Sequence, residues 1–199
     1  MQKTSIIYNA SFVEFVKIHT EDYLKKYPKR LKHIKRVVKK AKKLAEIYNV
    51  DIHMVEVAAY LHDITKKWSN KKHVDYLNSE EAIKYKKHPY YLHAATGSKY
   101  AKEVLNINHQ DILDAIYFHS TGIDRMTMLA KIIVVADMCD PKRKHWNPNK
   151  LFEIAKKDLD HALAQSLHLK MMHFIETKTE PHENLKRAYE YYKESIWIK

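Results

Sequence analysis

Residues Val55–Lys66 read VEVAAYLHDITK, an apolar segment that ends in an adjacent histidine and aspartate. Its apolar residues recur at helical spacing, and Asp51 stands where its side chain can cap the first turn, so the segment predicts a buried helix. Imidazole and carboxylate groups both bind divalent cations, and the side chains of His62 and Asp63 can converge where the helix ends. A His-Asp pair is expected about once by chance in a chain this rich in histidine. Its meaning therefore depends on the rest of the sequence.

The composition predicts an all-α fold in one domain. A chain of 199 residues fits a single core, and its 2 Gly and 5 Pro leave little material for the turns of an all-β protein. The apolar spacing indicates about eight to nine helices, including one long helix over residues 149–178. A strand over Ile132–Val135 is the one alternative, because that run is β-branched. Residues 1–10 have no clear pattern and are interpreted as a flexible or packed leader before a domain of residues 11–199.

The cysteine content and the hydropathy of the sequence indicate where in the cell the protein is located. The single cysteine, Cys139, excludes an internal disulfide, and no signal-peptide pattern begins the sequence. We therefore expect a cytoplasmic protein. Apolar runs such as Ile132–Ala136 fall far short of the ~20 residues that span a bilayer, so no membrane association is expected.

The formal charge of +12 and the pI near 9.5 suit an anionic partner. Most of the 36 basic residues are lysine, although arginine is the better reader of phosphates and bases. A solvated lysine surface is one interpretation, and attraction of an anionic ligand is the other. A small polyphosphate satisfies the second interpretation as well as RNA does, so a nucleic-acid partner is not expected.

Several predicted helices carry a potential metal ligand at the end or edge of an apolar face. A lone inward histidine is usually a core residue with a satisfied hydrogen bond. A buried carboxylate after the run IIVVA, however, costs several kcal/mol unless a cation or donor compensates it. Six potential ligands at such positions are therefore not easily dismissed as separate core residues: His33, His62, Asp63, His93, His119 and Asp137.

The order of these residues resembles the HD-domain phosphohydrolase superfamily, an all-helical fold. Five motifs narrow the resemblance to the bacterial HD-domain symmetrical dinucleoside-tetraphosphate hydrolases (the YqeK family), over about residues 11–190. Three positions depart from the family pattern: Ser120 replaces a threonine, and Cys139 and Asp140 replace Ile-Glu. The motifs are R-x-x-H-x-x-R-V at Arg30–Val37, A-x-L-H-D-I-T-K at Ala59–Lys66, H-A-A-T-G at His93–Gly97, F-H-S-T-G at Phe118–Gly122 and A-D-M-C-D-P-K-R at Ala136–Arg143.

The resemblance implies roles for individual residues. The metal ligands would be His33, His62, Asp63 and Asp137, holding iron (Fe) in the first instance, with Mn, Co or Mg as alternatives. A second metal at His93 and His119 is a secondary interpretation. The catalytic group would be Asp63, Lys66, His93 and His119, although Lys66 could also be a solvated lysine. The substrate-binding group would be Arg30, Asp63, His93, His119, Ser120, Asp137 and Arg143.

The resemblance further implies a function: hydrolysis of diadenosine tetraphosphate to two ADP by a metal-activated water. Two alternatives remain open at this stage. One is an HD-type hydrolase of (deoxy)nucleoside di- or triphosphates or of guanosine tetraphosphate, and the other is a non-catalytic basic module that binds RNA. A further prediction is that the protein forms a homodimer.

The residues do not indicate a purine preference, because no aromatic side chain is tied to a base pocket. Four aromatic residues are candidates for that contact: Trp68, Tyr90, Tyr91 and Trp146. Four further histidines share no helical register with the predicted ligands and are interpreted as surface or structural residues: His161, His168, His173 and His182.

Overall fold

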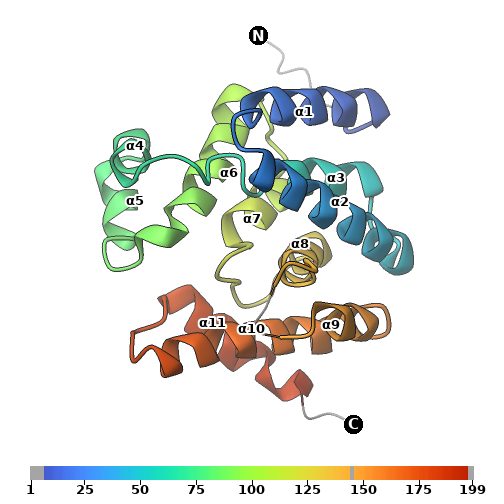
Figure 1. Cartoon of the computed structure of the whole chain (residues 1–199), viewed down its shortest axis with the longest axis vertical. Helices are drawn as coiled ribbons and strands as arrows, with labels where there is room; N and C mark the ends of the chain where they lie inside the picture. The colour runs from blue at the N-terminus through green and yellow to red at the C-terminus, as the bar shows by residue number, and fades with distance from the viewer. Residues whose placement is uncertain (1–6, 144–145, 197–199) are drawn as a thin grey trace.

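The computed structural model describes residues 7–143 and 146–196, and these residues form helices and loops without a strand (Figure 1). The all-α prediction is confirmed. The helices are α1 (Ala10–Tyr23), α2 (Pro28–Tyr48), α3 (Ile52–Leu61), α4 (Asn70–Tyr76), α5 (Ser79–Lys84), α6 (Leu92–Val104), α7 (Gln110–Phe118), α8 (Met128–Met138), α9 (Pro148–Ala155), α10 (Leu159–Glu176) and α11 (Glu183–Tyr192), with 3-10 turns at Pro89–Tyr91 and Lys193–Ile196.

The described chain has more helices than the apolar spacing indicated. The single helix expected over residues 149–178 is instead α9 and α10, because the Asp158 side chain accepts a hydrogen bond from the His161 N–H and starts a new helix. The short α5 lies in a polar stretch and follows Asn78, whose side chain accepts a hydrogen bond from the Glu81 N–H and caps the helix. Side-chain caps therefore set boundaries that the apolar pattern does not reveal.

The run Ile132–Val135 lies in the middle of α8, so the strand alternative is wrong. Thr127 caps this helix, and its residues from Ile132 to Met138 are all buried. A helix that is surrounded by others can be apolar on every side. Here α2, α7 and α10 all pack on α8.

Two groups of helices enclose the site. In Figure 1, α1, α2 and α3 lie together at one end, and α9, α10 and α11 form a layer at the other end. The first group meets α8 through α2, and the second group meets α8 through α10. No helix of the described residues is long and apolar enough to cross a membrane.

The helix before the His-Asp pair is shorter than the predicted one. It is capped by Asp51, as expected, but it ends at Leu61, so His62 and Asp63 lie in the turns that follow. At the N-terminus, the Asn9 side chain caps α1, which packs on α3. Residues 1–6 of the expected leader lie outside the described residues, and the division between residues 10 and 11 stays a prediction.

Candidate metal centre and active site

Three histidines point into the core with the same local geometry. Each follows or begins a helix, and each ring donates its Nδ1 hydrogen to the carbonyl three residues earlier. This bond leaves the Nε2 lone pair of each neutral ring facing inward, which is the arrangement that a metal ligand needs. The three contacts, each of 2.7 Å, join His62 Nδ1 to Ala59 O, His93 Nδ1 to Tyr90 O, and His119 Nδ1 to Ile116 O.

A fourth histidine reaches the centre from α2 and is oriented by a carboxylate instead. His33 Nδ1 contacts the Asp140 carboxylate, which also accepts hydrogen bonds from Arg36 Nε at 2.7 Å and Arg36 Nη2 at 2.9 Å. Burial opposes ionisation of Asp140, but Arg36 and His33 together lower the pKa of its carboxyl. Asp140 is therefore a fixed anion that turns the Nε2 atom of His33 toward the centre.

Two buried carboxylates complete the cluster. Asp63 Oδ2 lies 3.5 Å from both His33 Nε2 and His62 Nε2, and Asp63 Oδ1 lies 3.3 Å from His93 Nε2 and 3.7 Å from His119 Nε2. Burial raises the pKa of this carboxyl, but the surrounding imidazoles more than offset that and hold it well below its usual value. Among the described residues, Asp63 is thus the carboxylate that faces all four rings.

The donor set fits a divalent cation. His33 Nε2 and His62 Nε2 are buried and have no hydrogen-bond partner among the described residues. Two groups of ligand atoms are close enough to share an ion, namely His33 with His62 and Asp63, and Asp63 with His93 and His119. Mixed imidazole and carboxylate ligands suit iron, manganese or another borderline cation. The two groups share Asp63, so one or two ions would fit.

Asp137 lies beside the first group but is held differently. Its Oδ1 atom is 3.2 Å from His33 Nε2, while Arg143 Nη2 donates to both of its carboxylate oxygens at 2.7 Å. Burial raises the pKa of Asp137, whereas Arg143 and His33 hold it well below its usual value. Asp137 belongs to neither group of atoms close enough to share an ion, and its carboxylate is already paired with an arginine, so its role as a metal ligand stays a prediction.

Further cations and donors border the centre. Arg30 Nη1 contacts Asp63 Oδ2, and Lys66 Nζ lies 3.1 Å from both ring nitrogens of His93. Burial lowers the pKa of Lys66. Ser120 Oγ lies 2.9 Å from His119 Nε2 and 3.2 Å from His93 Nε2. Every residue named for the site from the sequence is therefore found in one cluster.

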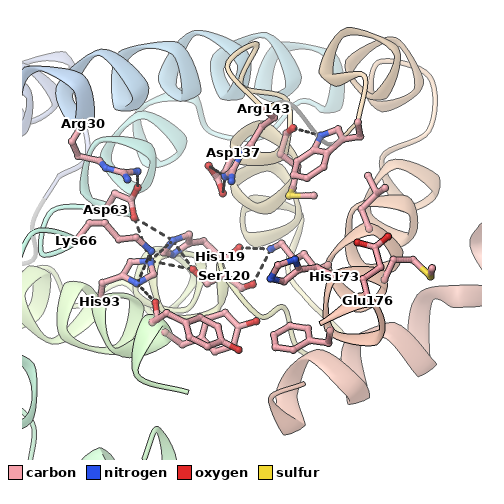
Figure 2. Close-up of a pocket in the computed structure, with 18 residues that line it drawn as sticks. Arg30, Asp63, Lys66, His93, His119, Ser120, Asp137, Arg143, His173 and Glu176 are labelled. Atoms are coloured by element: carbon pink, nitrogen blue, oxygen red, sulfur yellow. Dashed lines mark hydrogen bonds and ion pairs between the residues drawn. The ribbon is translucent and has the colours of Figure 1, made fainter. Parts of the chain in front are cut away.

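A cavity of about 500 Å³ opens beside the cluster. Figure 2 shows Arg30, Asp63, Lys66 and His93 on one side of it and His173 and Glu176 of α10 on the other. Of the aromatic candidates for a base contact, Tyr90, Tyr91 and Trp146 line the cavity. Trp68 does not; its indole donates to Tyr23 OH instead.

Sequence reasoning missed the contribution of α10. Lys170 lines the cavity and donates to the carbonyls of His119 at 3.1 Å and Ser120 at 2.9 Å, and burial lowers its pKa to about 8. His173, interpreted as surface or structural, is exposed toward the same cavity. No signal in the sequence marks these residues, because the polar face of α10 has the same pattern whether it meets solvent or a pocket.

The helical core and the cluster of histidines and aspartates are those of an HD domain, and the family model described as HD domain matches residues 30–142. A relative from Halalkalibacterium halodurans named symmetrical bis(5'-nucleosyl)-tetraphosphatase is 32% identical over 174 residues, which are 85% of this chain and 88% of the relative. A protein of the same name from Bacillus subtilis is 32% identical over 152 residues, 75% of this chain and 81% of the relative. The chain belongs to this branch of the HD-domain family.

A solved structure has the same fold. It is a predicted HD superfamily hydrolase involved in NAD metabolism from Clostridium acetobutylicum, with a TM-score of 0.79 and 32% sequence identity. The match covers 88% of this chain and 96% of that chain.

Proposed function

We propose that the chain hydrolyses diadenosine tetraphosphate symmetrically into two ADP. The observation that carries the proposal is the convergence of four imidazole Nε2 atoms and two carboxylates in one cluster. Four members of this cluster, Asp63, His93, His119 and Asp137, line a cavity of about 500 Å³ that is bordered by Arg30, Lys66, Arg143 and Lys170. Such a donor set can hold a divalent ion, and the cations beside it can bind a polyphosphate. The names of the relatives supply the substrate.

The metal is proposed to be iron, with Mn, Co or Mg as alternatives. His33, His62, Asp63 and Asp137 would hold it, and a second ion at His93 and His119 is the less favoured arrangement. The nitrogen and oxygen donors support a borderline cation over Ca²⁺. When bound, such an ion supplies Lewis acidity and makes a water nucleophilic near neutral pH.

The side chains around the cavity have proposed roles in the same reaction. Arg30 and Arg143 present planar donors that hold a phosphate by two hydrogen bonds at once. Ser120 and Lys66 donate to the same phosphates. Burial lowers the pKa of both His93 and His119, so their neutral rings can accept the proton of the attacking water. Water then bonds to one of the two central phosphorus atoms, the bridging P–O bond breaks, and ADP leaves.

Location and assembly are also proposals. We propose a cytoplasmic location, which the single cysteine, Cys139, supports because the sequence has no second cysteine with which it could form an internal disulfide. A homodimer stays a prediction that sedimentation analysis would test. The aromatic wall of the cavity supports one bound nucleoside without favouring either purine.

The products decide the function. Purified protein supplied with Fe²⁺, Mn²⁺ or Co²⁺ is incubated with diadenosine tetraphosphate, dATP or guanosine tetraphosphate, and an early time point is separated by chromatography. ADP as the single product of the first substrate is the expected result, with no turnover after chelation of the metal. Equal amounts of AMP and ATP, or preferential turnover of dATP or guanosine tetraphosphate, would contradict the symmetrical assignment.

A further inference from the structure

A second cavity adjoins the candidate metal centre. It has a volume of about 270 Å³ and is lined by six basic side chains, which we call the cationic groove: Lys29, Arg30, Arg36, Lys67, Lys142 and Arg143. His33 and Asp140 also line the groove, whereas Asp63 and Asp137 line the larger cavity. Since His33 Nε2 lies 3.5 Å from Asp63 and 3.2 Å from Asp137, the candidate metal centre lies where the two cavities meet.

Arg30 and Arg143 line both cavities. Figure 2 shows their side chains along one edge of the larger cavity, near Asp63 and Asp137, to which they are paired. The Nε atoms of both arginines are buried and have no hydrogen-bond partner among the described residues. The buried Nε atoms do not reach a ligand, but Arg30 Nη2 and Arg143 Nη1 make no hydrogen bond to a described residue either. Each arginine therefore has donor capacity left at the boundary between the two cavities.

The rest of the groove has uncompensated positive charge. Arg36 is paired with Asp140, but the ammonium groups of Lys29, Lys67 and Lys142 have no carboxylate within 4.0 Å in the part of the chain that the structure describes. Three unpaired lysines beside two arginines with free donors attract a multivalent anion. None of the described residues that line the groove is a tyrosine, tryptophan or phenylalanine, so it offers no stacking surface for a base.

We infer that the cationic groove binds the second diphosphate of a dinucleoside tetraphosphate, the one that belongs to the leaving nucleotide. The inference rests on the proposed function. The larger cavity has aromatic side chains and room for one nucleoside with its diphosphate, while the groove has charge and a smaller volume. The four-phosphate bridge would cross between them at the metal centre, and the second nucleoside would extend toward solvent. The protein would then recognise the leaving nucleotide through the charge of its diphosphate and not through its base.

The test compares two ligands on the metal-loaded protein by calorimetry: ADP, and a diadenosine tetraphosphate analogue with a methylene group in place of the central bridging oxygen. The test variant carries Lys29→Ala, Lys67→Ala and Lys142→Ala. A charge-matched control carries Lys39→Ala, Lys102→Ala and Lys157→Ala, which are exposed lysines outside the groove and without an ion-pair partner in the described chain. Both variants lose three positive charges.

We expect the wild type and the control to bind the analogue more tightly than ADP. The test variant should lose about tenfold in affinity for the analogue, because each exposed charge contact contributes modestly, and keep its affinity for ADP. Equal losses in the test and control variants, a test variant that keeps its affinity for the analogue, or a wild type that does not distinguish the two ligands would overturn the inference. Wild-type turnover of diadenosine tetraphosphate is measured separately, so the groove and the proposed function can fail independently.

Discussion

The inward histidines are fixed through their Nδ1 atoms, so it is the Nε2 atom of each ring that faces the centre. For His33, burial lowers the pKa, but the facing carboxylates of Asp137 and Asp63 more than offset it and raise the pKa to about 10. Without a cation, the carboxylate pair therefore favours a proton on His33. A divalent ion bound at the same atoms would take the place of that proton.

The first prediction at this scale concerns the ligands. Asp137→Ala and His62→Ala should each weaken metal binding about a hundredfold and abolish turnover, because a site worth about 10–16 kcal/mol is shared by roughly four ligands. Both variants should keep the wild-type helical circular dichroism. Metal content after dialysis, measured by mass spectrometry, checks the result. Full metal content and turnover in Asp137→Ala would remove this residue from the ligand set.

The second prediction concerns the residue that orients a ligand. Asp140→Asn should lower metal affinity by about 10- to 100-fold, because the amide has no charge to hold His33 and Arg36 in place. Asp75→Asn, at an exposed carboxylate paired with Lys71, is the matched control and should bind metal as the wild type does. Competition with a fluorescent chelator gives both affinities. Equal affinities in the two variants would mean that Asp140 does not position His33.

Among the helices, those whose position depends on the burial of apolar residues alone were the ones best predicted from the sequence. Apolar spacing predicted the buried helix α3, and it predicted that the six potential ligands lie at the end or edge of apolar helix faces. Two features depended on tertiary packing. The break between α9 and α10 comes from a cap at Asp158 that is indistinguishable from an ordinary surface aspartate. The contribution of Asp140 depends on a contact between α2 and the end of α8, 107 residues apart in sequence.

A pair of glycine substitutions tests the turn that follows α7. Gly122 has φ +70°, and a Cβ atom there would lie 3.0 Å from both Ala188 Cβ and Leu167 Cδ2. Gly122→Ala should lower the free energy of unfolding by about 2 kcal/mol, from the left-handed backbone and the overpacking together. Gly97→Ala is the matched control. Gly97 lies inside α6, and a Cβ atom there would make ordinary contacts of 3.4–3.7 Å with Ile116, Thr65 and His62.

The free energy of unfolding of Gly97→Ala should equal that of the wild type or exceed it by up to about 1 kcal/mol, since alanine is more favourable than glycine inside a helix. Urea unfolding of both variants, followed by circular dichroism, gives the two values. Equal stabilities of Gly122→Ala and the wild type would show that the turn adjusts without strain.

At the scale of the whole molecule, a buried polar network joins three segments around the site. Thr65 Oγ1 donates to the His93 carbonyl at 2.8 Å and lies 2.9 Å from Thr96 Oγ1, which in turn is 2.8 Å from His73 Nδ1. The network connects the turn after α3 with α6 and α4. Because it contains an imidazole that is 4% exposed, the stability of the fold should depend on pH.

Burial lowers the pKa of His73 to about 4. The unfolded chain takes up this proton near pH 6.5, whereas the folded protein does not, so the stabilisation is complete above pH 6.5 and is lost as the pH falls toward 4. The loss should reach about 3 kcal/mol. His73→Gln should show a flatter decline in the free energy of unfolding over this range, while His53→Gln, at a partly exposed histidine, should follow the wild type. Parallel curves for the wild type and His73→Gln would contradict the assignment.

The family match ends at residue 142, yet one wall of the larger cavity comes from α10, at residues 169–176. The predicted metal ligands and this wall are thus encoded in separate stretches of the gene. Mutations in the later stretch that spare Lys170, which donates to the carbonyls of His119 and Ser120, can alter which molecule is accepted while the predicted ligands stay in place. Divergence among descendants of a common ancestor should therefore be greatest in α10 when substrates differ, and a chimera that exchanges only this helix is the natural starting point for transferring specificity.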